Sequence, residues 1–128
     1  MTDLIQDLFG TSSVVCAVDG PTVHGDRDAV DLIGHAMQEG AGLVVVPVAR
    51  LDPRFFELRT GVAGDVVGKF ASYRIRLAIV GDIQQHVRRS AALQALVRES
   101  NRGDQLWFVE DLADLRPHLD RPPNPALR

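Results

Sequence analysis

The sequence predicts a single α/β domain with a mostly parallel sheet, and three observations predict it. Residues 43–48, Leu-Val-Val-Val-Pro-Val, are apolar throughout, as are strands that are buried on both faces. Strand-like runs alternate with segments of helical spacing, which favours right-handed crossovers between parallel strands. The length of 128 residues, with 45% hydrophobic and 24% charged side chains, suits one globular domain.

The first elements predict a β-hairpin that adds an antiparallel edge to the sheet. Residues 4–9 and 13–18 are apolar-rich and are separated by Gly10-Thr11-Ser12. The second run is rich in β-branched residues, whereas the first could equally form a helical turn. After a turn at residues 19–21, the apolar spacing of residues 26–39 predicts the first helix, with Gly40 just past its end.

The strand at 43–48 leads into a connector, residues 49–61, in which Asp52-Pro53 begins a single helical turn. Of the adjacent Phe55 and Phe56, we expect one in the core and one free to face a partner.

Residues 62–73 have the spacing of a second helix, on which Asp65 and Lys69 can pair across one turn. Gly64 and Gly68 share a stripe on this helix, which suggests that a strand or another chain packs closely there.

The remaining elements follow the same alternation. Residues 74–82 predict a central strand and residues 105–109 the last strand. Between them we expect Ser90 to cap a helix that ends near residues 101–103. After the last strand, Asp111 is expected to cap a short helix that Pro117 limits. The order β-β-α-β-α-β-α-β-α then occupies residues 1–119, and the proline-rich residues 120–128 predict a frayed tail.

Composition excludes several classes of function. The net charge of −3, from 17 acidic and 14 basic residues, argues against a nucleic-acid partner. The first ten residues contain two acids and no base, so we expect no secretory signal, and no apolar run reaches the ~20 residues of a membrane span. Cys16, the only cysteine, rules out an internal disulfide and favours a reducing compartment. We therefore expect a soluble cytoplasmic protein.

No motif completes a catalytic or cofactor site. In the segment RTGVAGDVVGKF, Ala63 and Phe70 replace the glycine and the hydroxyl that a P-loop requires. The four histidines are scattered, so we expect no metal, with His35 on a solvated helix face and His86 in a loop. Cys16 is interpreted as a small buried hydrophobic residue. We accordingly expect no catalytic residue and no cofactor.

Polar side chains and one aromatic residue gather at the ends of the predicted elements. In open α/β sheets ligands bind beyond the carboxyl ends of the strands, and helix N-termini favour anions. The resulting candidates for a ligand or partner site are Phe56, Glu57, Arg59, Thr60, Lys69, Asp82, Glu99, Asn101 and Arg102. The structural alternative remains open for each: Thr60 as a helix cap, Glu57 and Arg102 as a salt bridge, and Asn101 as a helix C-terminus.

The element order resembles that of STAS-type domains, similar to bacterial anti-sigma-factor antagonists. In those proteins a switch serine lies where the loop after the third strand enters the second helix, in a D-S-x-G-like context. Residues 59–62, Arg-Thr-Gly-Val, stand at that place, with Arg59 instead of the aspartate. The resemblance implies a regulatory module, and a phosphorylation switch at Thr60 is its least favoured form.

A closer resemblance is to the DUF4180 family of small bacterial proteins. It rests on DAVDLIG (28–34), FFELRTGVAGDVVGKFASYRIRLAIVGD (55–82) and RESNRGDQLWFV (98–109), whose blocks and spacing cover most of the chain. The family pattern usually has glutamate, glutamine and asparagine where this chain has Asp65, Gly68 and Ser72. This resemblance implies a shared fold and no particular chemistry.

Two functions follow as hypotheses. The first is a non-enzymatic regulatory or interaction module with a protein partner, or a homodimer formed through the glycine stripe or a sheet edge. The alternative is a protein or minor enzyme for a small acidic ligand, in which Arg59 and Lys69 neutralise the anion and Glu57 or Glu99 is the general base. An enclosed pocket lined by these four residues would favour the alternative, and a flat apolar surface would favour the first.

Overall fold

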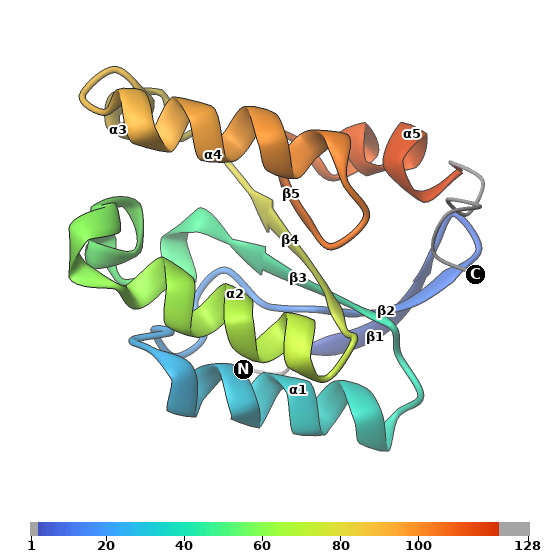
Figure 1. Cartoon of the computed structure of the whole chain (residues 1–128). Helices are drawn as coiled ribbons and strands as arrows, with labels where there is room; N and C mark the ends of the chain where they lie inside the picture. Colours follow the sequence, from blue (N-terminus) through green and yellow to red (C-terminus); the bar gives the residue numbers. More distant parts are fainter. Residues whose placement is uncertain (1–2, 121–128) are drawn as a thin grey trace.

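The computed structural model describes residues 3–120, which form one five-stranded sheet with helices on both faces (Figure 1). The strands are β1 (Leu4–Leu8), β2 (Thr11–Val15), β3 (Leu43–Pro47), β4 (Arg76–Val80) and β5 (Leu106–Val109). The α-helices are α1 (Asp26–Gln38), α2 (Val62–Ser72), α3 (Gln84–Val87), α4 (Ala91–Arg102) and α5 (Arg116–Leu119). Short 3₁₀ turns are η1 (Val48–Arg50), η2 (Pro53–Phe56), η3 (Leu58–Thr60) and η4 (Leu112–Leu115).

The sheet is mixed and its strands follow the chain, in the order β1-β2-β3-β4-β5. β1 runs antiparallel to β2, and the other three pairings are parallel. The α/β class predicted from the sequence is therefore confirmed. The description as a mostly parallel, STAS-like sheet is not matched, because the antiparallel β1 makes the sheet mixed.

The hairpin turn lies one residue earlier than predicted. Phe9 and Gly10 form a two-residue turn with φ of 52° and 88°, and Thr11 already belongs to β2. Positive φ at both turn residues gives the twist that matches two flanking antiparallel strands. The Asp7 carboxylate accepts a hydrogen bond from Gly10 N at 2.8 Å and fixes this turn. The predicted turn at residues 10–12 is wrong. The observed turn begins with Phe9, and a positive φ is not expected from the sequence at a bulky aromatic residue.

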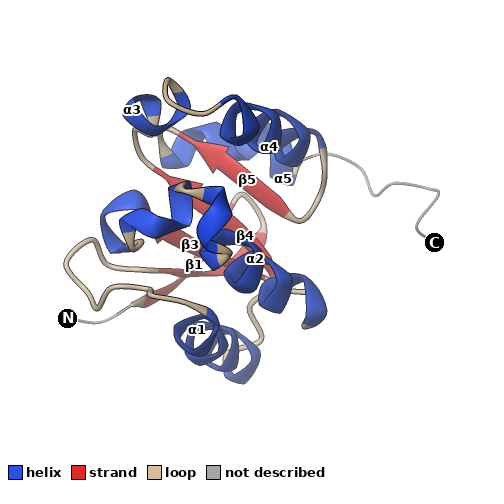
Figure 2. Ribbon diagram, turned by 60° about the vertical axis from the view of Figure 1, so that its left-hand side comes forward, coloured by secondary structure: helices blue, strands red, loops and turns tan. Residues whose placement is uncertain are grey.

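The two sheet faces are covered unequally. Alternate strand residues on one face, including Val44, Leu77 and Phe108, pack with side chains from α1, α2 and α4. The three long helices share this face because sequential right-handed crossovers place each helix on the same side. On the other face η4 and α5 cover Leu43 and Trp107. α1 and α2 lie side by side, whereas α4 lies over β5, as Figures 1 and 2 show.

Ser90 and Asp111 cap helical segments as predicted, with Ser90 Oγ accepting from Leu93 N at 3.0 Å. The single turn expected after Asp52 is two 3₁₀ turns, η2 and η3. Pro117 does not limit the last helix. It lies in the first turn of α5, where its missing N–H costs nothing.

The glycine stripe of α2 does not pack closely against any described residue. A Cβ built at Gly64 or Gly68 meets no atom within 4 Å. The inference that a strand of this chain approaches there is therefore wrong. The predicted tail lies outside the described residues from position 121 onward. Between residues 3 and 120, the structure contains no helix with the length and apolar character to cross a membrane.

Candidate functional site

A groove lies between the η2–η3 connector and the start of α4. Its volume is about 610 Å³, and its lining consists of Pro53, Phe56, Glu57, Leu58, Arg59, His86, Arg89, Ser90 and Ala92. These residues come from segments on either side of β4 in sequence. The parallel topology brings these segments together. The connector follows β3 and α3 follows β4, and the carboxyl ends of these two parallel strands lie next to each other.

The connector holds its shape through hydrogen bonds of its own side chains. Asp52 begins η2 by accepting from Arg54 N at 3.0 Å. The Thr60 hydroxyl lies 2.7 Å from Glu57 O and 2.8 Å from Arg54 O, and it also accepts from Val62 N at 3.3 Å. Gly61 then takes φ of 80°, which opens α2 at low steric cost. Thr60 therefore has a structural role, close to the predicted cap.

The base of the groove is aromatic. Phe55 and Phe56 are both buried, at 0% and 4% exposure, so the expectation that one of them faces a partner is wrong. The two rings meet edge to face at 5.2 Å, and Phe56 stacks on His86 with centroids 4.3 Å apart. His86 belongs to α3 rather than to a loop. Two adjacent phenylalanines are both accommodated because η2 turns one toward the sheet and the other under α3.

The rim of the groove carries more positive than negative charge. Arg59 and Arg89 contribute guanidinium groups, and Glu57 contributes the one carboxylate among the described residues of the lining. Arg59 lies 3.9 Å from Glu57, and the side chains are 87% and 55% exposed. Such an exposed and distant ion pair is weak, so Arg59 is free to turn toward an incoming anion.

Six of the nine predicted site residues lie outside this lining. Asp82 lines a second cavity of about 200 Å³ near the ends of β4 and β5, and its carboxylate accepts from Gln84 N at 2.9 Å. Lys69 is half-buried on α2, and no ion pair joins it to Asp65 in the described part of the chain. Thr60 is exposed and supports the connector through the hydrogen bonds of its hydroxyl group.

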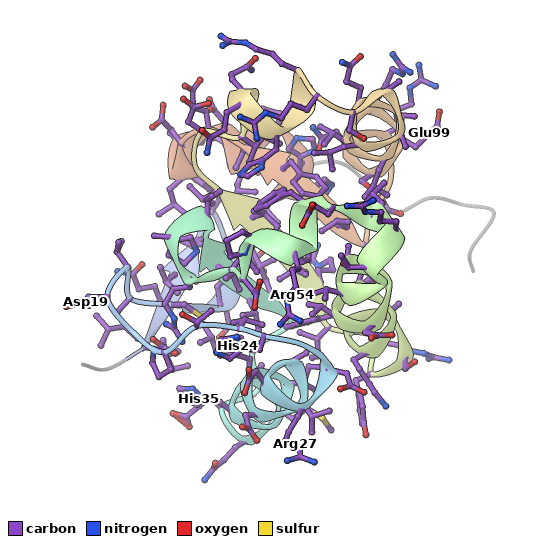
Figure 3. All side chains as sticks on the ribbon, turned by 90° about the vertical axis from the view of Figure 1, so that its left-hand side faces the viewer. Asp19, His24, Arg27, His35, Arg54 and Glu99 are labelled. Carbon is purple, nitrogen blue, oxygen red and sulfur yellow. The ribbon has the colours of Figure 1, made fainter. Side chains whose placement is uncertain are left out.

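The other three lie toward the C-terminal end of α4. Glu99 pairs loosely with Arg102 at 3.5 Å, and Glu99 points outward from the helix (Figure 3). The Asn101 amide donates to Phe108 O at 3.0 Å and accepts from Phe108 N at 2.8 Å. Seven residues of helix separate Glu99 from Ala92, which is about 10 Å along the axis. The nine side chains therefore do not form one cluster, and the proposed Glu57–Arg102 salt bridge is not formed.

Six lining residues were not among the predicted site residues, and of these His86 and Arg89 carry the ionisable side chains. A signal was present for Arg89, because it directly precedes the predicted cap Ser90 and must lie where α4 begins. The start of α4 lies near the carboxyl ends of the strands, beside the connector. His86 could not be placed without the short helix α3.

A second polar cluster joins the connector to the loop before α1. Asp52, whose side chain is 12% exposed, lies 3.0 Å from His24 Nδ1 and accepts from both Nε and an Nη of Arg54, at 3.1 and 2.8 Å. Figure 3 shows His24 and Arg54 directed toward each other. Hydrogen bonds from the Arg54 side chain, the Arg54 backbone and His24 hold the pKa of Asp52 well below its usual range.

Arg50 is a buried cation that the sequence analysis also missed. It is 4% exposed and donates to Pro21 O at 2.6 Å, Asp3 Oδ1 at 2.8 Å and Ala17 O at 3.0 Å. Burial opposes ionisation of Asp3, but hydrogen bonds from Ala17 N and Arg50 outweigh it and lower the Asp3 pKa. Burial, followed by the charge of Asp3, raises the pKa of the nearby Cys16 thiol to about 12, consistent with a buried and unreactive cysteine.

The chain belongs to the family described as "Domain of unknown function (DUF4180)", whose model matches residues 9–119. The predicted resemblance to this family is thereby confirmed. No curated protein and no solved structure matches the chain at a significant level.

Proposed function

We propose that the protein is a cytoplasmic, non-catalytic binding module whose groove takes a small acidic ligand with a flat apolar body. The observation that carries the proposal is the combination of an aromatic base, Phe56 on His86, with two arginines at the rim. The volume of about 610 Å³ lies within the range of small-molecule sites, roughly 300–1,000 Å³.

The chemistry of the lining supports recognition of an anion. A guanidinium group can donate two parallel hydrogen bonds to a carboxylate, which makes arginine selective for planar acids. Arg59 and Arg89 together outweigh Glu57, so a bound carboxylate reduces the local excess of positive charge. Pro53, Leu58 and Ala92 provide the apolar surface against which the body of the ligand packs.

The groove favours binding over catalysis. Within residues 3–120, Ser90 is the one hydroxyl residue of the lining, and its oxygen already accepts the Leu93 N–H that starts α4. His86 contributes its ring face to the Phe56 stack. A nucleophile needs a base within hydrogen-bond reach, and among the described residues no hydrogen bond joins the Ser90 hydroxyl to the His86 ring.

Binding of three probe compounds tests the proposal. We expect benzoate to bind and to raise the midpoint temperature of thermal unfolding. At a benzoate concentration of 100 times Kd, the free energy of unfolding should rise by about 2.7 kcal/mol. Benzamide, its neutral isostere, should bind at least tenfold more weakly. Succinate, which has charge without a ring, should bind more weakly than benzoate. Equal binding of benzoate and benzamide, or binding of none of the three, would contradict the proposal.

Two substitutions locate the site. Arg59→Ala or Arg89→Ala should weaken benzoate roughly 10- to 100-fold, since a hydrogen bond to a charged group contributes about 1.5–3 kcal/mol. Arg98→Ala is the matched control, because Arg98 is exposed on α4 and does not line the groove. Titration calorimetry gives the affinities, and an equal loss in all three variants would assign the effect to net charge rather than to the groove.

A further inference from the structure

The two edges of the sheet differ in how their backbone is occupied. On the β5 edge, the Asn101 side chain binds both the N–H and the carbonyl of Phe108, in the manner of a neighbouring strand. β1, at the other edge, pairs only with β2 among the described elements. Four of its five residues are exposed, including Leu4 at 55% and Ile5 at 40%.

β1 has little of the protection that natural sheet edges usually carry. Such edges are blocked by charged side chains, especially lysine, and by proline, bulges, short strands or a covering segment. Among these, β1 has one charged residue, Asp7, and a length of five residues. The strand reads Leu-Ile-Gln-Asp-Leu, and its pairing with β2 continues without a bulge. The preceding Asp3 does not provide a free charge, because Arg50 binds it at 2.8 Å.

We propose that β1 is a dimerisation edge, at which a second copy of this chain adds its own β1 in the antiparallel direction. The hairpin geometry determines which backbone groups are available. Residues flanking a two-residue turn form a hydrogen-bonded pair, so Leu8, Gln6 and Leu4 bond to β2. The backbone groups of Ile5 and Asp7 then point outward.

Strand overlap and charge select one register among the two-fold arrangements that use these outward groups. A two-fold axis through Asp7 places two carboxylates opposite each other. An axis through Ile5 leaves Leu8 without a partner in β1 and pairs Asp7 with Asp3, which lies outside the strand and is bound by Arg50. An axis through Gln6 pairs all five residues of β1, places Ile5 opposite the second Asp7 and keeps the two Asp7 carboxylates apart. In that register each Ile5–Asp7 pair exchanges both backbone hydrogen bonds, and Leu4 covers the second Leu8.

Cysteine cross-linking tests the register. In the Gln6-centred dimer the two Gln6 residues form a pair without backbone hydrogen bonds, with Cα atoms about 4.5 Å apart, which a disulfide can bridge. Gln6→Cys should therefore give a covalent dimer on oxidation. Ile5→Cys, the matched control on the same strand, should not, because each Ile5 faces Asp7. Cross-linking of both variants alike, or of neither, overturns the proposal.

Charge substitutions at Ile5 give a second, reversible readout. Ile5→Asp places acid opposite Asp7, and Ile5→Lys places a base there. The dimer should be weaker in the first variant than in the second, on the order of tenfold. Sedimentation equilibrium up to about 1 mM protein would detect even a weak dimer of the unmodified chain. A monomer throughout that range, or equal behaviour of the two variants, overturns the proposal, and ligand binding in the groove is measured independently.

Discussion

At the scale of single residues, the least expected feature is the buried Arg50. Its guanidinium group occupies the space that a side chain at position 20 would need. A Cβ at Gly20 would lie 2.5 Å from an Arg50 Nη. Arg50 thus joins η1 to the loop after β2 and to Asp3. Nothing in the local pattern around residue 50 predicts this, because arginines in connectors are normally exposed.

Removing Arg50 should cost much more than removing a surface arginine. We expect Arg50→Met to lower the free energy of unfolding by about 3 kcal/mol, because Asp3 loses its positive partner and two backbone carbonyls lose a donor. Urea unfolding measures this. Asp3→Asn in the same background should recover part of the loss, because it removes the uncompensated charge. Additive losses in the double variant would show that the two side chains do not act as a pair.

The lowered pKa of Asp52 predicts a pH-dependent contribution to stability. An aspartate whose pKa is depressed by folding stabilises the fold above its unfolded value of about 3.9, and this stabilisation is lost as the pH falls through the folded value. Asp52→Asn should therefore be less stable than the unmodified protein at pH 7, and the difference should shrink below about pH 4. Urea unfolding from pH 7 to pH 2 tests this, with the exposed Asp65→Asn as control. A difference that stays constant with pH would contradict the assignment.

At the scale of elements, α2 carries two glycines, Gly64 and Gly68, that no contact with a described residue requires. Both are exposed, and a Cβ at either meets open space. Gly68→Ala should raise the free energy of unfolding by about 1 kcal/mol, the difference in helix propensity. Gly81→Ala is the contrasting control, since Gly81 has φ of 141° and its Cβ would lie 2.8 Å from Val48. Loss of stability in Gly68→Ala would indicate that this stripe has a partner.

The elements themselves were largely predictable. The buried run of β3, the helical spacings of α1, α2 and α4, and the caps at Ser90 and Asp111 all arise from local patterns that the structure retains. Errors arose where local propensity was overruled. Phe9 adopts positive φ because the two-residue turn suits the strand twist, and Phe55 and Phe56 are both buried because two 3₁₀ turns replace one.

At the scale of the whole molecule, the candidate site was only partly predictable. Phe56, Glu57 and Arg59 were identified because they surround the entrance of a helix, and the groove contains all three. Glu99, Asn101 and Arg102 were grouped with them by sequence position alone. α4 runs back along β5 and carries these residues about 10–15 Å along its axis from the groove, which no pattern within α4 could indicate.

The Asn101 amide has a consequence for assembly that goes beyond the stability of β5. A sheet that can be extended at both edges can grow head to tail into a filament, whereas a sheet with one accessible edge must stop when that edge has been used. In the β1-paired dimer proposed above, assembly would then stop at two copies, because Asn101 already binds the outward backbone groups of Phe108. On that proposal, replacing Asn101 with alanine should expose the β5 edge and allow the dimers to polymerise.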